Sequence, residues 1–292
     1  MQARTHPARA GHRWIAEGWR LFRQQPFGFA MLLFTFMTGI LIAHLMVQGV
    51  AMILARLIPG VAPQYIAEAG GMLIAVLVPG LTVGFLEGCR AVRARQPLQP
   101  QMMVKAFASD ADTRRNLLVL GLVYSIGMRI VLSIAMGADL PMPPPGSDAP
   151  AGGAGGAVGA GGGAPAPVAL PPEAGNILLM HVLVALAAYV PIAMVLWYAP
   201  VLVAWHRIGA GKAMFFSLAA CWRNRAAFVV YALSWFAIVM ALSLLGGALR
   251  IGGLGDASVV LLMPLMFVIV LTMYCSVYPS YHDVFSEIDT QA

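Results

Sequence analysis

Six long apolar runs dominate the pattern of hydrophobic and polar positions along the chain. They cover residues 27–51, 71–89, 117–136, 176–205, 226–249 and 259–278. A helix needs about 20 apolar residues to cross the hydrocarbon core of a bilayer, and each run meets or approaches that length. The pattern therefore predicts an all-α fold, a polytopic membrane bundle of six spanning helices.

Prolines interrupt several of these runs and predict local distortions. Pro79 lies at the centre of the second run, where a missing backbone N–H should kink the helix. Pro191 and Pro200 lie in the fourth run, which is long enough to tilt or break. The stretch 52–70 is apolar but contains Arg56 and several other interruptions. We expect it to lie in the outer interface or to dip back into the membrane rather than to span.

Three amphipathic segments, at 14–27, 105–118 and 212–228, each combine an apolar face with a basic cluster before a span. In the first, Trp14, Gly18 and Phe22 share one helical face, opposite Arg13 and Arg20. Such segments are typical of interfacial helices on a membrane surface. We expect four tryptophans near the ends of the spans to act as anchors at headgroup depth, namely Trp14, Trp19, Trp205 and Trp222.

The other two amphipathic segments repeat the arrangement with different residues. Met103 and Phe107 would stack on one face of a short helix that begins after Pro100, and Asp110 and Asp112 are suitable N-cap residues for the third span. In the last segment the apolar stripe consists of Met214, Phe215, Leu218 and Trp222. Pro79–Arg115 and Pro191–Arg225 also have matching order and similar length, which indicates a parallel repeat unless every cytoplasmic loop simply looks basic and amphipathic.

Composition and charge agree with a membrane location. Of the 292 residues 60% are hydrophobic and 10% charged, against about 25% charged in soluble domains, and the mean hydropathy is +0.80. The formal net charge is +6. Because the Lys and Arg residues flank the apolar runs, we interpret this charge as a signal for membrane orientation and anionic headgroups rather than for nucleic acid.

The distribution of basic residues predicts the topology. With the N-terminus inside, 15 of the 18 Lys and Arg residues fall in segments on the cytoplasmic side, and only Arg56 and Arg250 fall outside, with Arg129 within the third span. This bias predicts six spans with both termini in the cytoplasm. The near absence of lysine and the abundance of Ala and Gly indicate a GC-rich bacterial genome, so we expect a multi-pass protein of a bacterial inner membrane. The first apolar run is too long for a cleaved signal peptide.

Residues 138–175 divide the chain into two halves. They include the run AGGAGGAVGAGGGAPAPVALPP, which has no periodicity and almost no bulky side chains. A segment of this composition cannot bury a core, so we expect a disordered Gly/Pro-rich tether on the outer side. The predicted domains are a first three-span half at 1–137, with the N-terminal interfacial helix, and a second three-span half at 176–292.

Ionisable residues at membrane depth are candidates for function. Arg129, His44 and His181 would lie at a similar depth, and together they could form a polar site for a substrate or a proton. The favoured interpretation is structural: Arg129 reaches the outer headgroups, and both histidines are neutral and hydrogen-bonded. Glu87 lies within one turn of Arg90, and we expect a local ion pair between them.

The sequence contains none of the common motifs of catalytic or metal sites. Neither HExxH, GxSxG nor a Walker A sequence occurs, so no catalytic residue, cofactor or metal ligand is predicted. Cys89, Cys221 and Cys275 lack metal-ligand spacing and should be small free hydrophobes on the reducing side. Gly80, Gly84 and Gly88 form a ladder that could pack against another helix, within the chain or across a dimer.

A resemblance is carried by residues in both halves of the chain, outside the central tether: Gly18–Trp19, Leu21–Phe22, Pro26, Pro79–Gly80 through Arg90, Trp197, Pro200, Ser217, Cys221 and Asn224. In these positions the sequence resembles an uncharacterised family of bacterial six-span inner-membrane proteins. It is more distantly similar to the membrane domain of some glycerophosphodiester phosphodiesterases, without their catalytic domain. The resemblance implies a location and an architecture, and no activity.

Three functions are compatible with the sequence. The first is a non-enzymatic assembly, regulatory or envelope-organising component that contacts lipids, a protein partner or a second copy of itself. The second is a small transporter or exporter with a polar site around Arg129. The third is a membrane-embedded lipid enzyme, against which the missing clusters of catalytic side chains count.

Overall fold

The computed structural model describes residues 4–58, 63–137 and 172–285, and within these ranges the chain forms helices and no strands. Six of the described helices or helix pairs are long and apolar enough to cross a membrane: Pro26–Leu57, Tyr65–Arg93, Ala111–Met136, Leu179–His206, Arg225–Leu254 and Ala257–Phe285. The predicted all-α class with six spans is confirmed. The predicted tether falls almost entirely outside the described residues.

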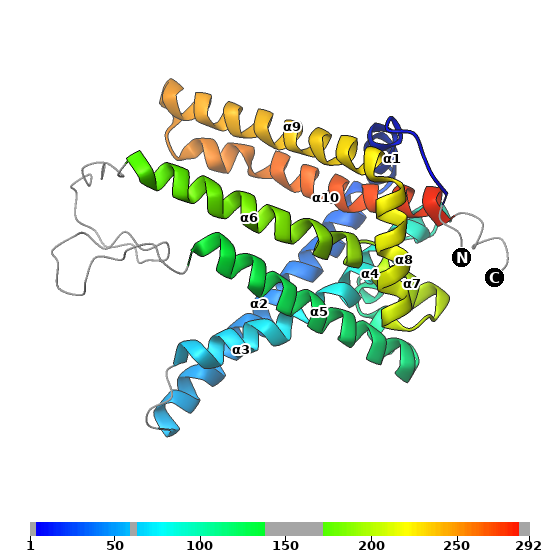
Figure 1. Cartoon of the computed structure of the whole chain (residues 1–292), viewed down its shortest axis with the longest axis horizontal. Helices are drawn as coiled ribbons and strands as arrows, with labels where there is room; N and C mark the ends of the chain where they lie inside the picture. The colour runs from blue at the N-terminus through cyan, green and yellow to red at the C-terminus, as the bar shows by residue number, and fades with distance from the viewer. Residues whose placement is uncertain (1–3, 59–62, 138–171, 286–292) are drawn as a thin grey trace. The chain divides into compact units, whose positions relative to one another are not determined.

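The helices follow the chain in the order shown in Figure 1. They are α1 (Ala10–Gln24), α2 (Pro26–Leu57), α3 (Pro63–Ala75), α4 (Val78–Arg93), the 3₁₀ turns η1 (Pro100–Met103) and η2 (Lys105–Ala108), α5 (Ala111–Met136), α6 (Pro172–Leu196), α7 (Ala199–His206), α8 (Ala210–Arg223), α9 (Arg225–Leu249), the π-turn η3 (Arg250–Leu254) and α10 (Ala257–Phe285).

The chain divides into two compact units, with boundaries inside α5 and α6. The first unit contains Met1–Ile126 and Pro191–Ala292, and the second contains Gly127–Val190. In the first unit, α1 packs against α9 and α10, and α4 packs against α7 and α10. Helices from the two ends of the sequence therefore form one core, while the predicted division at 138–175 stays a prediction.

Two of the spans break where the prolines indicated. A turn at Val76–Leu77 separates α3 from α4, and Trp197–Tyr198 separates α6 from α7. The second break is closed by a side chain of α8: the Tyr198 N–H donates to Ser217 Oγ at 3.0 Å, and the Ser217 hydroxyl donates to the Met194 carbonyl at 2.8 Å. Backbone groups that the break releases thus regain partners, which a buried chain requires.

The described parts of the stretch 52–70 are helical, and their expected position in the outer interface stays a prediction. Helix α2 continues to Leu57, and α3 begins at Pro63, so both sides of this stretch extend spanning helices. Arg56 lies in the last turn of α2, where a positive charge interacts favourably with the negative end of the helix dipole. Proline is also well tolerated in the first turn of a helix, because the first N–H groups of a helix have no intrahelical partner. Arg56 and Pro63 are therefore helix-end residues, whereas Glu68 lies within α3.

The glycine ladder of the second span packs within the chain. A Cβ atom on Gly84 would lie 2.6 Å from the Met103 Cα, and one on Gly88 would lie 2.7 Å from a Leu32 methyl group. At Gly80 the neighbour is the Phe107 ring. Met103 belongs to η1 and Phe107 to η2, so the single short helix expected here is wrong, and two 3₁₀ turns fill the groove.

The C-terminal end of α10 and the N-terminal end of α5 can also be compared with the predicted spans. Helix α10 continues through Pro279 to Phe285, beyond the end of the predicted sixth span at residue 278. The N-cap prediction for the third span is confirmed for Asp110, whose carboxylate accepts the Thr113 N–H at 3.1 Å. This hydrogen bond, followed by that of the Thr113 hydroxyl, lowers the pKa of Asp110.

Helices α1 and α8 lie across the direction of α9 and α10 (Figure 1). Helix α1 approaches the backbone of α10 closely at a glycine, because a Cβ atom on Gly18 would lie 2.6 Å from the Ser276 Cα. Around this contact the core is aromatic, with Trp14, Phe228 and Tyr231 in ring contact. Helix α1 is consequently part of the folded core and not only a surface segment.

Candidate functional site at the basic end

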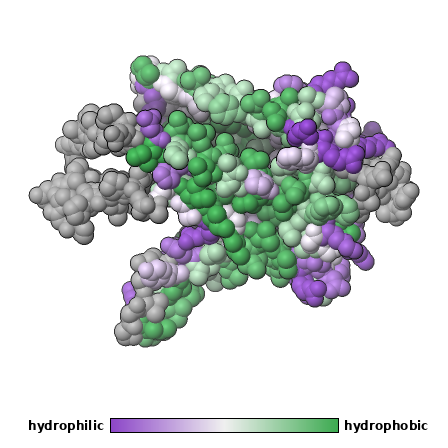
Figure 2. Space-filling view, viewed as in Figure 1, coloured by the Kyte–Doolittle hydropathy of each residue, from purple (hydrophilic) through white to green (hydrophobic). Residues whose placement is uncertain are grey.

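Charged and hydrogen-bonding residues of the first unit gather at one end of it, which we call the basic end. It is formed by α1, the ends of α4, α7 and α10, η2, and α8 with the start of α9. Figure 2 shows hydrophilic residues over this end of α1 and the α7–α8 connection, whereas the sides of the long helices are hydrophobic. Three groups of polar contacts hold the elements together here.

Asp283, near the end of α10, is the first of these connections. Its Oδ2 atom accepts a hydrogen bond from Trp14 Nε1 at 2.8 Å and another from the Arg13 guanidinium. Arg13 also lies 3.7 Å from Glu17 in the next turn of α1. Because Asp283 receives a charge-assisted bond and an indole bond, it fixes both the position and the rotation of α1 on α10.

Asn224, between α8 and α9, is the second connection and is almost completely buried. Its Oδ1 atom accepts the His6 N–H at 2.8 Å, and its Nδ2 atom donates to the carbonyls of Arg4 and Ala220 at 2.8 and 2.9 Å. The segment before α1 also reaches α10, since the Arg4 N–H donates to the Val284 carbonyl at 3.1 Å. One amide side chain thus joins the N-terminal segment to the α8–α9 corner.

Glu87 in α4 is the third connection, and the predicted Glu87–Arg90 ion pair is wrong. Glu87 Oε1 accepts a hydrogen bond from Trp205 Nε1 at 2.6 Å, and Oε2 lies 3.7 Å from Lys105 Nζ. Arg90 instead covers the Trp205 ring, with its guanidinium carbon 5.3 Å from the ring centroid. The tertiary contact with α7 replaces the local pair, because the indole N–H needs an acceptor when it is partly buried.

Aromatic rings of α10 continue this group. Tyr281 is buried, shares a 2.6 Å hydrogen bond with His206 Nε2, and contacts the Trp205 ring at a centroid distance of 5.0 Å. Arg93 lies over the Tyr278 ring at 5.9 Å. These contacts pack cations on ring faces, which is a favourable arrangement near a polar boundary.

The four tryptophans predicted as anchors therefore behave differently from one another. Trp14 is 0% exposed, so the interpretation of this residue as a membrane anchor is wrong, whereas Trp205 is partly buried and donates to Glu87, and its role as an anchor stays a prediction. Trp19 and Trp222 are exposed at 41% and 62%, as an interfacial position requires. The predicted stripe on α8 is likewise open at Phe215, Leu218 and Trp222.

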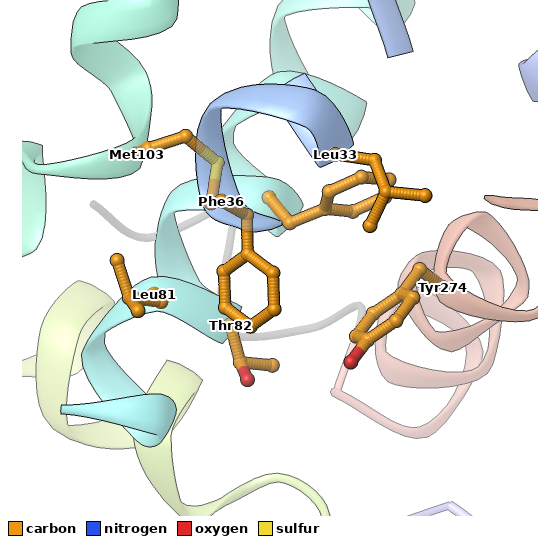
Figure 3. Close-up of a pocket in the computed structure, with 7 residues that line it drawn as sticks. Leu33, Phe36, Leu81, Thr82, Met103 and Tyr274 are labelled. Carbon is orange, nitrogen blue, oxygen red and sulfur yellow. The ribbon is translucent and has the colours of Figure 1, made fainter. Parts of the chain in front are cut away.

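A small pocket lies away from the basic end, between α2, α4, η1 and α10 (Figure 3). It is lined mainly by apolar side chains, including Phe36, Leu81 and Met103, with Thr82 and Tyr274 as polar members. Its volume is about 10 Å³, at the lower limit for a single water molecule. We regard it as a packing defect between helices.

The predicted polar site in the membrane is divided between the two units. His44, in the first unit, lies 3.3 Å from Gln48 Nε2, one turn along α2. His181, in the second unit, contacts the Ile177 carbonyl at 2.8 Å through Nδ1, and Arg129 is an exposed residue of the same unit. A shared site of Arg129, His44 and His181 stays a prediction.

The cysteines are free and buried, as the sequence indicated. Burial raises the pKa of Cys221 in α8 to about 12, so its thiol stays protonated at neutral pH. In the part of the chain that the structure describes, no group of three His, Cys, Asp or Glu residues could hold a metal ion.

Sequence reasoning missed three residues that organise this end: Asp283, Asn224 and Ser217. Asp283 and Asn224 have partners far away in the chain, 269 positions for Trp14 and Asp283 and 218 for His6 and Asn224, whereas the partners of Ser217 lie 19 and 23 positions away. For Asn224 a usable signal existed, a single amide between two arginines at the start of an apolar run. For Ser217 the signal would have been a hydroxyl on the small-residue face of an amphipathic helix.

Fold and site together define a polytopic helical membrane protein whose basic end is closed by tertiary hydrogen bonds. The chain is 32% identical over 289 residues to the probable inner membrane protein BTH_II0599 of Burkholderia thailandensis, and the match covers 98% of this chain and 94% of that protein. The chain belongs to the family of this probable inner membrane protein, and it is a multi-pass protein of the inner membrane.

Two other comparisons found no match. No family model matches the chain, and no solved structure matches it. The resemblance to an inner-membrane family is thus supported by the Burkholderia protein, whereas nothing found here supports the more distant similarity to glycerophosphodiester phosphodiesterases.

Proposed function

We propose that the protein is a non-enzymatic component of the inner membrane that assembles or regulates a partner complex through the outward face of α1. In this proposal both termini lie in the cytoplasm, as the distribution of Lys and Arg predicts. The observation that carries the proposal is the fixed orientation of α1. Its inner face is held by Gly18 and Trp14, so its outer face has one defined direction.

The outer face of α1 is strongly cationic. Arg13, Arg20 and Arg23 are exposed, and Glu17 is engaged with Arg13 at 3.7 Å. Asp283 offsets the charge of Arg13 alone. The charges of Arg20 and Arg23 therefore remain for an external acidic group. Rigid display of cations favours a protein interface, because preorganised side chains lose little entropy on binding.

The polar side chains at the basic end also support a binding role over catalysis. Asp283, Glu87 and Asn224 each bond to residues from other helices, and these contacts account for their positions. Such residues connect elements and position α1. A platform of this kind explains why polar residues cluster at one end of an otherwise apolar protein.

The test uses a photo-crosslinking amino acid in the full chain, expressed at its native level in its own host. We expect a defined crosslinked partner from position 20 on α1 and none from position 236, an exposed site in the middle of α9. The double substitution Arg20→Glu with Arg23→Glu, probed from position 24, should remove the adduct without lowering the amount of protein in the membrane.

The opposite result would overturn the proposal. If position 20 gives no adduct, and the Arg20→Glu, Arg23→Glu variant complements a deletion strain completely, then α1 is not a partner surface. The transporter alternative makes a different prediction, since it requires Arg129. A loss of function in Arg129→Gln, with α1 crosslinks unchanged, would favour it.

A further inference from the structure

Helix α8 has two apolar faces of different character. The inner face is buried and consists of small residues: Ala210, Ala213, Ser217, Ala220 and Cys221. The outer face carries Phe215, Leu218 and Trp222, of which Phe215 is 66% and Trp222 62% exposed. Helix α8 contacts α7 and α9, and within the described chain its outer stripe stays largely exposed.

The position of α8 places this stripe at a membrane boundary. Helix α8 crosses the direction of α9 and α10 (Figure 1), and after Asn224 the chain enters α9, which is a candidate span. A helix that lies across the spans at the first turn of one of them is parallel to the membrane plane. Its aromatic side chains are then level with the border between headgroups and acyl chains.

The charge around the stripe has one sign. Lys212, Arg223 and Arg225 are exposed, and residues 207–228 contain no Asp or Glu. The Arg225 guanidinium lies over the Trp222 ring at 5.9 Å, so a cation and an aromatic ring are presented together. An anionic surface with an apolar layer beneath it is complementary to this arrangement.

A second copy of the chain fits this face less well. Two copies that meet through the same face would bring the cations of one α8 against those of the other, and like charges in contact oppose association. We propose that the outer face of α8 is a docking surface for anionic phospholipids. Phe215, Leu218 and Trp222 enter the leaflet, and Lys212, Arg223 and Arg225 contact the headgroup phosphates.

This inference rests on the membrane location and not on the proposed role of α1. Crosslinking of α1 in cells and lipid contact of α8 in a purified system are separate readouts, so either proposal can fail alone.

The test places a fluorescent label at position 215 through Phe215→Cys, in the full chain in nanodiscs. The native cysteines are buried and will not react, as a labelled parent protein without the substitution verifies. We compare discs of phosphatidylcholine with discs that also contain phosphatidylglycerol. Brominated acyl chains report contact with lipid, and aqueous iodide reports contact with water.

We expect brominated lipid to quench the label at position 215, and quenching to increase when the brominated lipid is phosphatidylglycerol. Arg223→Gln with Arg225→Gln should reduce this preference for phosphatidylglycerol by about an order of magnitude at low ionic strength. The matched control is Phe236→Cys on α9, 62% exposed against 66% for Phe215, where the same label should be quenched equally by both lipids.

Three results would overturn the proposal. Quenching by iodide and not by brominated lipid would place the stripe in water. Protection from both quenchers would show that protein covers it, whether a second copy or another chain. Equal quenching by both brominated lipids would show that the face does not select anionic phospholipids, which contradicts the argument from charge.

Discussion

Helices α1 and α8 share one sequence pattern and have opposite environments. Each is an amphipathic stretch with basic residues at its end, followed by a spanning helix. In α1 the central tryptophan, Trp14, is 0% exposed and bonded to Asp283, whereas in α8 Trp222 is 62% exposed. An apolar stripe with tryptophan and arginine therefore does not by itself identify a membrane-facing helix.

The position of the small residues separates the two cases. In α1 the glycines Gly11 and Gly18 lie within the aromatic face, so that face approaches the backbones of α9 and α10. In α8 the alanines lie opposite the aromatic face, so the alanine side packs on protein and the aromatic side stays open. The face that contains small residues is the one that packs, because close backbone approach requires it.

The largest expected effect is the difference in stability between truncating Trp14 and truncating Trp222. Trp14→Ala removes a buried ring and leaves Asp283 without its indole donor, so we expect a loss of about 3–5 kcal/mol in the free energy of unfolding. Trp222→Ala should change it by less than about 0.5 kcal/mol in detergent. Denaturant unfolding of both variants measures the difference, and equal losses would contradict the distinction between the helices.

Glycine substitutions sharpen the comparison at the backbone. In Gly18→Ala the new Cβ atom would lie 2.6 Å from Ser276, so α1 must move away from α10, at an expected cost of about 1–3 kcal/mol. Gly211→Ala in α8 meets no atom within 4 Å and should be neutral or stabilising by up to about 1 kcal/mol. Thermal unfolding in detergent reports both, and a destabilised Gly211→Ala would show that α8 has a hidden packed face.

Ser217→Ala tests how α8 is held. The Tyr198 N–H and the Met194 carbonyl would both lose their partner at the α6–α7 break, so we expect a loss of about 1–2 kcal/mol. Ser133→Ala is the matched control, because its exposed hydroxyl only bonds the Ile130 carbonyl in its own helix, at 2.8 Å. A loss of the same size in both variants would mean that the break needs no support from α8.

Much of the fold follows from the sequence, because membrane spans are specified locally. Each predicted span corresponds to one described helix or to a pair of consecutive helices. The breaks near Pro79 and at Trp197–Tyr198 follow from the geometry of proline. The ends were less predictable. Helix α2 reaches Leu57 and α10 reaches Phe285, because polar residues at helix ends do not interrupt a helix as they interrupt a hydropathy pattern.

The basic end could be predicted only in outline. The basic clusters indicated where it lies, and the exposed stripe of α8 was correctly read from its spacing. The contacts that organise it join residues at opposite ends of the chain, such as Trp14 with Asp283, and no local pattern contains them. Glu87 shows the same limit, since its nearest cation in sequence is not its partner.

Hydrogen exchange of the full chain in nanodiscs tests the central distinction between α1 and α8 most directly. Amide protection is followed along both helices in discs of phosphatidylcholine, with and without phosphatidylglycerol. We predict that α1 is strongly protected in both lipids, and that protection of α8 increases with phosphatidylglycerol. Protection of α1 that depends on the anionic lipid, with α8 unchanged, would contradict the account.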